Sequence, residues 1–546
     1  MRALAAVVAT VLCVAGCDDG AARDAERDAG ERDDSGASDA SAPAIQRGLT
    51  IATAKGNLRG AQVGATRVFQ GIPYAAPPVG ALRWRAPVPA EAWDGTLDAT
   101  APGPMCPQFV PIVGNVDDRG DEDCLSLNVW TPEPAPKTPL SVMVWIHGGS
   151  FEIGSGAEPQ YDGRLLSERG DVVVVTINYR LGPLGFLAHP ALEADDPDGG
   201  AGNWGIRDQQ LALRWVHDEI AAFGGDPGSV TVFGESAGAM SACVHLVAPE
   251  SRDLAQRVIM ESGVCVRGDG TRAPVQSAEQ AHELGARFAK GVGCDADGDV
   301  AGCLRALSAE DALRWTENAA DFLSEVRWRP VIDGKVIPDA PEAMIADGDW
   351  SGVPIVLGTN RDELALFVAP PLGMPIATRD AYVALVAAQY PGRADEVLAQ
   401  YPADDDAAAN DAFVRLMSDW IFTCPTRTLA RAAADVGGAT YLYSFEQVPS
   451  NSIFGDIGVF HAAEIPFVFG TSSPLGGADS APALSEAMQN YWTAFAHAGD
   501  PNGGDLEAWP RYETASDKHM VLALPLVAGV GLRREACDFW DAFAAP

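Results

Sequence analysis

One short stretch of the sequence has the residue types and spacing of an activated serine nucleophile. Residues 234–238 read Gly-Glu-Ser-Ala-Gly, follow the apolar run 230–233 and precede a helical pattern. In a G-x-S-x-G turn between a strand and a helix, small neighbours admit a strained backbone and expose the serine hydroxyl above the sheet. The five letters alone are a weak signal in a glycine-rich chain, but their place between a predicted strand and a predicted helix strengthens it. Ser236 is therefore the candidate nucleophile.

A second glycine-rich turn lies upstream, where the apolar run 141–146 leads into His-Gly-Gly-Ser-Phe at residues 147–151. Glycines in such a turn free backbone N–H groups to point at a substrate oxygen, where they stabilise developing negative charge. Each donor of this kind contributes roughly a 10²- to 10³-fold increase in rate. We expect His147 to pack within the loop and to take no part in the chemistry.

A serine nucleophile needs a histidine base and an acid that orients it, and after this type of turn the chain order is Ser, acid, His. Only His461 lies in a predicted loop after a late strand, so it is the candidate base. We expect the acid just after the strand at 354–358, where Asp362 and Glu363 both fit the pattern. The histidines downstream of Ser236 are His245, His282, His461, His497 and His519.

The elements that must position these residues alternate along the chain. Strands alternating with helices predict a mainly parallel sheet with helices on both faces. We see no internal repeat or linker after residue 46, so residues 46–546 are predicted to form one large α/β domain. Apolar runs typical of strands lie at 141–147, 171–178, 229–233, 256–261, 354–358, 440–445 and 519–524, and helical patterns lie at 208–223, 237–247, 277–290 and 484–497.

The composition and charge of the chain limit the kinds of partner that it can bind. The chain has 546 residues, of which 47% are hydrophobic and 21% charged, which is a globular composition. Its formal net charge is -37, the wrong sign for binding nucleic-acid phosphates. We therefore expect no nucleic-acid partner and interpret the acidic surface as one that keeps an exported protein in solution.

The N-terminus predicts export. Residues 1–16 have the charged start, short apolar stretch and small residues of a signal peptide. Val14-Ala15-Gly16-Cys17 also fits a lipoprotein cleavage site, after which acyl chains on Cys17 would hold the protein on a membrane surface. Residues 17–45 are polar and lack aromatic residues, which predicts a disordered tether. The expected location is the bacterial cell envelope, periplasmic or surface-exposed; the alternative is ordinary secretion with an incidental cysteine.

Taken together, the motifs resemble the type B carboxylesterases, the family of carboxylesterases and cholinesterases, from about residue 49 to the end of the chain. Any one stretch could match by chance, but their combination and order are highly specific. The matching stretches are 69–75 (FQGIPYA), 77–84 (PPVGALRW), 122–129 (EDCLSLNV), 178–182 (NYRLG), 202–209 (GNWGIRDQ), 234–238 (GESAG) and 458–464 (GVFHAAE).

This resemblance implies an α/β-hydrolase fold and a serine esterase that forms an acyl-enzyme on small-molecule carboxylic esters. It selects Glu363 over Asp362 as the acid and His461 as the base of a triad with Ser236. It also implies that the backbone N–H groups of Gly149, Ser150 and Ala237 form the oxyanion hole. The mechanism needs no metal or organic cofactor. The resemblance does not indicate an oligomeric state.

Eight of the ten cysteines follow Cys17, and none has the short paired spacing of a zinc site. An even number in an exported chain favours disulfides. The resemblance implies three pairs, Cys106 with Cys124, Cys294 with Cys303, and Cys424 with Cys537. It leaves Cys243 and Cys265, which we expect to be buried free thiols, with a fourth bridge as the alternative. It also implies structural ion pairs of Arg83 with Glu122 and of Arg180 with Asp208.

The resemblance leaves the substrate open. Cholinesterases of this family carry a tryptophan for the quaternary ammonium group in the first disulfide loop, since a cation binds over an aromatic face. The residues between Cys106 and Cys124 include Phe109 but no tryptophan. We therefore favour a general carboxylesterase. The alternatives are a lipase or amidase with the same triad, or a non-catalytic binding module, which the presence of Ser236, Glu363 and His461 disfavours.

Overall fold

A computed structural model describes residues 48–110, 115–116, 120–195, 200, 202–267, 274–295, 298–315, 327–370, 373–452, 455–473 and 476–544. The expectations for the signal peptide, for Cys17 and for the tether lie outside these residues. The described residues contain no helix long and apolar enough to cross a membrane.

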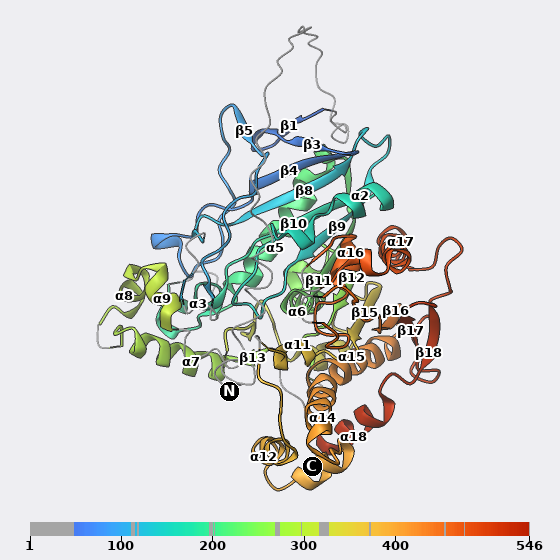
Figure 1. Cartoon of the computed structure of the whole chain (residues 1–546). Coiled ribbons are helices and arrows are strands. Elements are labelled where there is room, and N and C mark those ends of the chain that lie inside the picture. The colour runs from blue at the N-terminus through green and yellow to red at the C-terminus, as the bar shows by residue number, and fades with distance from the viewer. Residues whose placement is uncertain are drawn as a thin grey trace.

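In the described part of the chain, eleven strands form one central sheet (Figure 1). The strands from β17 to β10 run parallel, and β18, β8, β4 and β3 extend the sheet with antiparallel pairs. In spatial order they are β18 (Val527–Val530), β17 (Lys518–Leu522), β16 (Thr440–Phe445), β15 (Ile355–Asn360), β12 (Arg257–Glu261), β11 (Gly225–Glu235), β9 (Leu140–Ile146), β10 (Val173–Ile177), β8 (Ser126–Pro132), β4 (Thr66–Pro73) and β3 (Ala61–Val63).

The expected α/β-hydrolase architecture is therefore present as a single domain with a mainly parallel sheet. Each of the seven predicted strands is found, as β9, β10, β11, β12, β15, β16 and β17. The antiparallel strands β3, β4, β8 and β18 were missed. The strands were predicted from their alternation with helices, which is the pattern of a parallel sheet. The four antiparallel strands have no long helix between themselves and a neighbouring strand in the chain, so this pattern does not reveal them.

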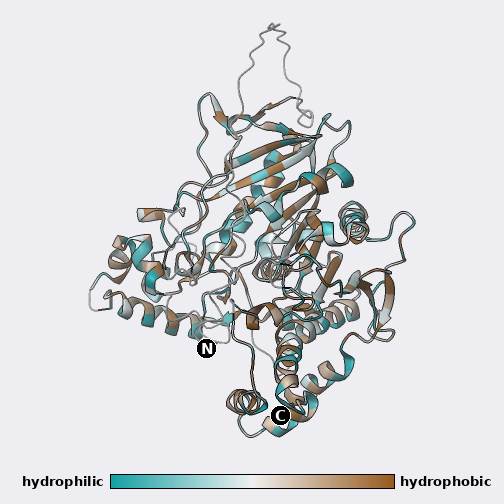
Figure 2. Cartoon of the chain, in the orientation of Figure 1, coloured by the Kyte–Doolittle hydropathy of each residue, from teal (hydrophilic) through white to brown (hydrophobic). Residues whose placement is uncertain are grey.

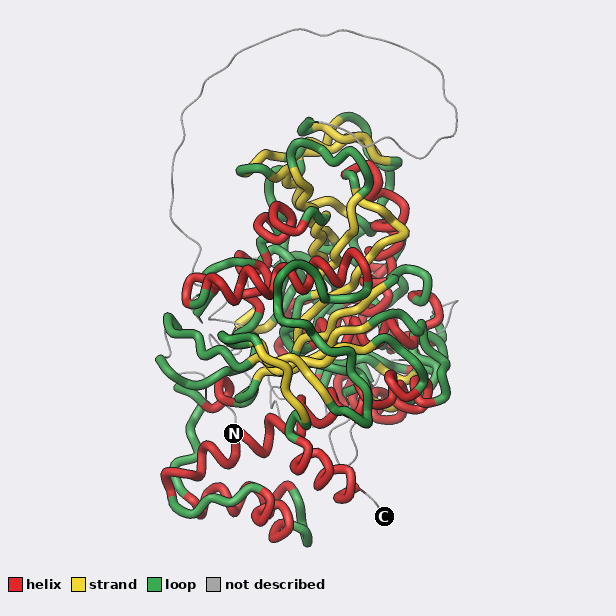
Figure 3. The backbone as a smooth tube through the Cα atoms, turned by 90° about the vertical axis from the view of Figure 1, so that its right-hand side faces the viewer, coloured by secondary structure: helices red, strands yellow, loops and turns green. Residues whose placement is uncertain are grey.

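Side chains of the parallel strands alternate between two cores, one on each face of the sheet. In β9, Val142 and Val144 point into one core, whereas Met143 and Trp145 point into the other. Because both faces are covered by helices, the parallel strands are mainly apolar, and Figure 2 shows much of the central arrows in brown. Figure 3, a perpendicular view, shows helices and loops on both sides of the central strands. Helices α5 (Trp204–Glu219), α6 (Ala237–Val247) and α7 (Ala278–Gly291) contribute to the first core, and α2 (Arg164–Gly170), α16 (Ile465–Phe469) and α17 (Pro482–Ala498) to the second.

A second group of helices comprises α12 (Arg379–Gln389), α13 (Ala394–Gln400), α14 (Asp406–Ser418), the π-helical turn η6 (Asp419–Thr423), α15 (Cys424–Asp435) and α18 (Arg534–Ala544). In Figure 1, α12, α14 and α18 lie at the bottom, whereas α15 packs against β15 and β16. The remaining elements are β1 (Thr50–Thr53), β2 (Gly56–Arg59), η1 (Gly80–Leu82), β5 (Thr96–Asp98), β6 (Phe109–Val110), β7 (Asn115–Val116), η2 (Pro159–Tyr161), α3 (Gly182–Phe186), α4 (Pro190–Glu193), η3 (Ile220–Phe223), η4 (Pro249–Ser251), β13 (Gln276–Ser277), α8 (Val300–Ala306), α9 (Ala309–Arg314), β14 (Val331–Ile332), α10 (Pro341–Ala346), α11 (Ala365–Val368) and η7 (Ala478–Ser480).

Four disulfides link the described residues. Three are the implied pairs, Cys106–Cys124, Cys294–Cys303 and Cys424–Cys537. The fourth joins Cys243 to Cys265, so the expectation of free thiols was wrong. Its cause is tertiary: β11 and β12 are adjacent parallel strands, so the helix after β11 lies against the loop after β12.

The two expected ion pairs are also present; the Arg180–Asp208 pair is buried and the Arg83–Glu122 pair is partly buried. Arg83 Nη2 lies 2.5 Å from Glu122 Oε2, and Arg180 Nη2 lies 2.7 Å from Asp208 Oδ1. Arg83 additionally donates to the carbonyls of Arg305 and Leu307, and Arg180 donates to the carbonyl of Arg85. These charges tie loops together and do not line the pockets described below.

Candidate active site

The candidate nucleophile lies in a strained turn between β11 and α6. Ser236 has φ 54° and ψ −119°, a left-handed conformation that costs a non-glycine residue free energy. Two glycines allow the close approach that this turn needs. A Cβ atom at Gly238 would overlap the carbonyl of Ile146 at the end of β9, and one at Gly234 would lie 2.6 Å from that same oxygen. The local sequence therefore forms the turn that places Ser236 at the carboxyl edge of the sheet.

The candidate base and acid meet at the same edge of the sheet, because β15 and β16 are adjacent parallel strands. His461 Nδ1 lies 2.6 Å from Glu363 Oε2, and both side chains are buried. The backbone N–H of His461 also donates to the carbonyl of Glu363. Asp362 turns the other way and accepts a hydrogen bond from the N–H of Val459 at 2.9 Å. Of the two carboxylates that the pattern allows, Glu363 is the one against His461.

The second imidazole nitrogen faces an acid that the sequence analysis did not assign. His461 Nε2 lies 2.9 Å from Oε1 of Glu235, the residue before Ser236. Among the described residues, Ser236 Oγ makes no hydrogen bond to His461, although both residues line one pocket. Burial lowers the pKa of His461, but the carboxylates of Glu235 and Glu363 outweigh burial and hold that pKa well above its usual value.

The expected oxyanion-hole residues surround Ser236. Three consecutive residues, Gly149, Ser150 and Phe151, have positive φ angles of 102°, 58° and 63°. The loop is held by the N–H of Ile153, which donates to the carbonyl of Gly149, and by a bond from Gly182 N to Phe151 O. Ala237 is the first residue of α6, so its N–H has no acceptor within the helix. Gly149, Ser150 and Ala237 all line pockets next to Ser236.

The other histidines lie elsewhere in the fold. His147 stacks on Tyr179 at 4.5 Å, and burial lowers its pKa to about 4, so it is neutral and packs within the loop as expected. His245 bonds to Ser251 and Gln209 between α5 and α6. His282 contacts Glu193, His497 contacts Ser141, and His519 lies in β17.

Two pockets open on either side of Ser236. The first, named here the apolar pocket, adjoins Ala237 and is lined mainly by Phe151, Met240, Pro274, Trp328, Ile421 and Phe422, with Ser150, Arg327 and Arg329 as its polar members. The second, the histidine-side pocket, contains both His461 and Glu235 and is lined further by Gln108, Glu158, Gln160, Tyr161 and Phe367, among others. The rings of Phe422 and Phe367 lie 4.8 and 5.4 Å from the imidazole of His461.

Two further buried acids interact electrostatically with Glu235, and the sequence analysis did not identify them. Glu261 accepts a hydrogen bond from Trp492 Nε1 at 2.8 Å, and burial raises its pKa to about 8. Glu464 is bonded to the side-chain amide of Asn360, and burial raises its pKa well above the usual value. Glu235 and Glu464 lie within the motifs 234–238 and 458–464, so the sequence could have pointed to them as site residues. Glu261 lies in no such motif.

In the described residues, no group of three or more His, Cys, Asp or Glu side chains is arranged to hold a metal ion.

The parallel sheet and the residues gathered at its carboxyl edge define an α/β-hydrolase. Comparison with known proteins gives the family: the model of the Carboxylesterase family matches residues 47–540, and the chain belongs to that family and is a carboxylesterase. It is 36% identical over 486 residues to the para-nitrobenzyl esterase of Bacillus subtilis (strain 168), which covers 86% of this chain and 94% of that protein. It is 34% identical over 534 residues to the acetylcholinesterase of Bungarus fasciatus, which covers 91% of this chain and 86% of that protein.

Proposed function

We propose that the chain hydrolyses small to medium carboxylic esters through an acyl-enzyme formed on Ser236. His461, oriented by Glu363, takes the proton of Ser236 Oγ as that oxygen attacks the ester carbonyl. For this step Nε2 releases Glu235 and accepts the Ser236 hydroxyl; Glu235, Ser236 and His461 all line the histidine-side pocket. Catalytic hydrogen bonds often tighten only when substrate binds. The observation that carries the proposal is the 2.6 Å contact between His461 and Glu363 beside the pocket that Ser236 lines.

Collapse of two tetrahedral intermediates, one in each half of the reaction, returns the enzyme to its starting state. The N–H groups of Gly149, Ser150 and Ala237 stabilise the oxyanion of the tetrahedral intermediate. When this intermediate collapses, the bond to the alcohol oxygen breaks and His461 gives that oxygen its proton. Water then attacks the acyl-enzyme with His461 as its base; when the second tetrahedral intermediate collapses, the bond to Ser236 Oγ breaks, His461 returns the proton to that oxygen, and the acid leaves.

The pockets suggest which part of the ester lies where. His461 must reach the leaving oxygen, so the alcohol part belongs in the histidine-side pocket. The apolar pocket touches Ser236 and two oxyanion-hole residues without touching His461, so it suits the acyl chain. Its lining of Phe151, Met240, Ile421 and Phe422 favours a hydrocarbon chain, since burial of apolar surface contributes about 25 cal/mol per Å².

A cholinesterase is a weaker proposal than a general esterase, despite the acetylcholinesterase relative. The first disulfide loop contributes Gln108 to the histidine-side pocket and contains no tryptophan to bind a quaternary ammonium group. A lipase or an amidase would use the same residues, because the groups that form an acyl-enzyme do not specify the leaving group.

Hydrolysis of p-nitrophenyl esters from acetate to palmitate, by the full chain and by its Ser236→Ala variant, tests the proposal. We expect release of p-nitrophenol that falls at least 10³-fold in the variant, with an optimum at short or medium chains. A phosphonate ester probe should label Ser236 in a tryptic digest. Equal activity of the two proteins, or labelling at another residue only, would refute the mechanism, and an optimum at palmitate would indicate a lipase.

We propose also that Cys17 is acylated and anchors the chain to the bacterial cell envelope, facing the periplasm or the cell surface. The support is the sequence alone: the apolar leader, the small residues before Cys17 and the polar stretch that follows. Metabolic labelling with palmitate should mark the wild type and not the Cys17→Ala variant. Equal labelling of both proteins would reject the anchor, and a variant found in the medium would support it.

A further inference from the structure

One turn of π-helix interrupts the path from α14 to α15. Residues Asp419–Thr423 form this turn, η6, between Ser418 and Cys424. A π-helical turn inserts one extra residue into an α-helix, so the side chains within it point in directions that a continuous helix would not allow. Such turns occur frequently at functional sites.

The turn presents two side chains to the candidate active site. Ile421 and Phe422 line the apolar pocket beside Ser236, and the ring of Phe422 lies 4.8 Å from that of His461. Just before the turn, Ser418 Oγ accepts a hydrogen bond from the N–H of Leu364, the residue after Glu363. A shift of η6 would therefore move the wall of the apolar pocket directly. It would affect His461 and Glu363 only through packing contacts.

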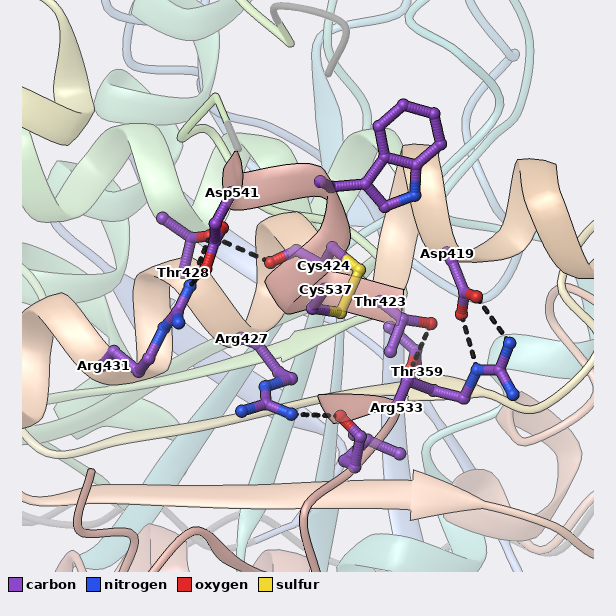
Figure 4. The surroundings of a disulfide bond; sticks show 12 residues. Thr359, Asp419, Thr423, Cys424, Arg427, Thr428, Arg431, Arg533, Cys537 and Asp541 are labelled. Atoms are coloured by element: carbon purple, nitrogen blue, oxygen red, sulfur yellow. Dashed lines mark hydrogen bonds and ion pairs between the residues drawn. A yellow bond between two sulfur atoms is a disulfide. The ribbon is translucent and has the colours of Figure 1, made fainter. Parts of the chain in front are cut away.

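A buried carboxylate at the start of η6 fastens it to the C-terminal segment. Asp419 is 1% exposed and accepts two hydrogen bonds from Arg533, Nε to Oδ1 at 2.8 Å and Nη2 to Oδ2 at 2.6 Å (Figure 4). Tyr401 OH donates to the same carboxylate at 3.0 Å and accepts from Trp540 Nε1 in α18 at 2.9 Å. A two-point arginine–carboxylate contact fixes direction as well as distance.

The other end of η6 has two further attachments. Cys424, directly after the turn, is bonded to Cys537 in α18. The hydroxyls of Thr423 and Thr359 lie 3.4 Å apart, which connects the turn to β15, and Figure 4 shows both attachments. The turn is thus held at both ends, and the C-terminal segment from Arg533 to Trp540 provides most of the attachment.

We propose that η6, held by the Asp419–Arg533 pair, determines the acyl-chain preference of the enzyme. Arg533 and Asp419 are positioning residues: they do not touch the ester, but they set how far Ile421 and Phe422 reach into the apolar pocket. The C-terminal segment thereby takes part in substrate selection. This proposal rests on the function proposed for Ser236 and adds the element that shapes its acyl site.

The test compares full-chain variants on p-nitrophenyl acetate, butyrate and octanoate. Phe422→Ala reports a direct change of the pocket wall, and Arg533→Gln and Asp419→Asn remove the attachment. Arg534→Gln is the matched control, because the neighbouring Arg534 pairs with Asp517 and not with Asp419. Rates are divided by the number of active sites that a phosphonate probe titrates, which removes any loss of folded protein, and the melting temperature is measured for each variant.

We expect Arg533→Gln and Asp419→Asn to change the octanoate-to-acetate ratio of kcat/KM by about fivefold or more, in the same direction as Phe422→Ala, and mainly through KM. Arg533→Lys should recover part of the change, since it keeps the charge but makes one contact. Arg534→Gln should keep the wild-type ratio.

A uniform loss on all three esters in Arg533→Gln, or an unchanged ratio with a lower melting temperature, would overturn the proposal and leave the pair a purely structural role. An unchanged ratio in Phe422→Ala would overturn it as well. If Arg533→Gln yields no folded protein, Arg533→Lys decides the question by the same ratio. If the function proposed for Ser236 is wrong, the result is different: esterase activity survives in the Ser236→Ala variant.

Discussion

Asp362 and Glu363 are neighbours in the chain, yet their carboxylates have different partners. Glu363 is fully buried against Nδ1 of His461, whereas Asp362 bonds to the backbone of Val459 and to the guanidinium of Arg361. Both residues lie in the turn that follows β15, so their spacing from the strand leaves both eligible. At this scale, function depends on which carboxylate reaches the imidazole.

The variants Glu363→Gln and Asp362→Asn should therefore differ in kcat by orders of magnitude. The amide in Glu363→Gln cannot stabilise the imidazolium, and we expect kcat for p-nitrophenyl acetate to fall by about 10³- to 10⁴-fold. Asp362→Asn weakens a loop contact and should cost about 1–2 kcal/mol of unfolding free energy and less than about tenfold in kcat. Steady-state kinetics and guanidinium unfolding measure the two effects. The reverse order of kcat losses would assign the acid to Asp362.

Glu235 should affect the pH dependence of kcat/KM. His461 acts as a base only when neutral, so activity is lost as pH falls through its pKa. Glu235 and Glu363 raise that pKa, and removal of one carboxylate in Glu235→Gln lowers it. We expect the acid limb of kcat/KM to move to lower pH by roughly one unit. Glu250→Gln, at an exposed site paired with Arg214, is the control, and an acid limb that stays in place or moves upward in Glu235→Gln would contradict the assignment.

Elements meet at the site because consecutive parallel strands end at one edge of the sheet. The chain segments that follow β9, β11, β15 and β16 carry the expected oxyanion loop and the candidate nucleophile, acid and base. A disulfide between Cys243 and Cys265 joins α6, whose first residue is Ala237, to the loop after β12. This bond ties the nucleophile's helix to the neighbouring strand.

Removal of that disulfide should lower stability. For a sequence separation of 22 residues, the chain-entropy model gives about 3 kcal/mol. We expect a Cys243→Ala, Cys265→Ala double variant to lose an unfolding free energy of that size in guanidinium. Alkylation of the unfolded wild type without reductant should leave the peptides of both cysteines unmodified. Modification of both would show free thiols and contradict the disulfide.

The whole molecule carries a formal net charge of -37 around one continuous α/β domain. Mutual repulsion of surface carboxylates disfavours the compact state, and salt screens it, since the Debye length falls from about 10 Å at 0.1 M to about 3 Å at 1 M. The buried pairs Arg180–Asp208 and Arg427–Asp517 are screened much less than exposed charges.

Thermal stability should therefore rise with salt. Between 0.02 and 0.5 M NaCl we expect the melting temperature to increase by roughly 2–5 °C, measured by scanning calorimetry at pH 7.5. Equal ionic strength supplied by KCl should give the same increase, because screening does not depend on the ion. A melting temperature that falls steadily with NaCl would mean that attractive surface pairs outweigh the repulsion.

Local patterns determined a large part of this protein from sequence alone. The elbow around Ser236, the turn at 147–151 and the parallel strands between helices depend on neighbours a few residues apart, so their glycines and apolar runs predict them. The resemblance to carboxylesterases added the family and three of the four disulfides.

Tertiary structure decided what depends on distant segments. Glu363 and His461 are 98 residues apart, and their contact follows from the register of β15 with β16. Glu235 against His461 and Cys243 bonded to Cys265 also require particular neighbouring strands. The π-helical turn η6 is held by residues more than 100 positions away. Sequence periodicity does not specify which strands become neighbours in the sheet, so only the packed structure brings these groups together.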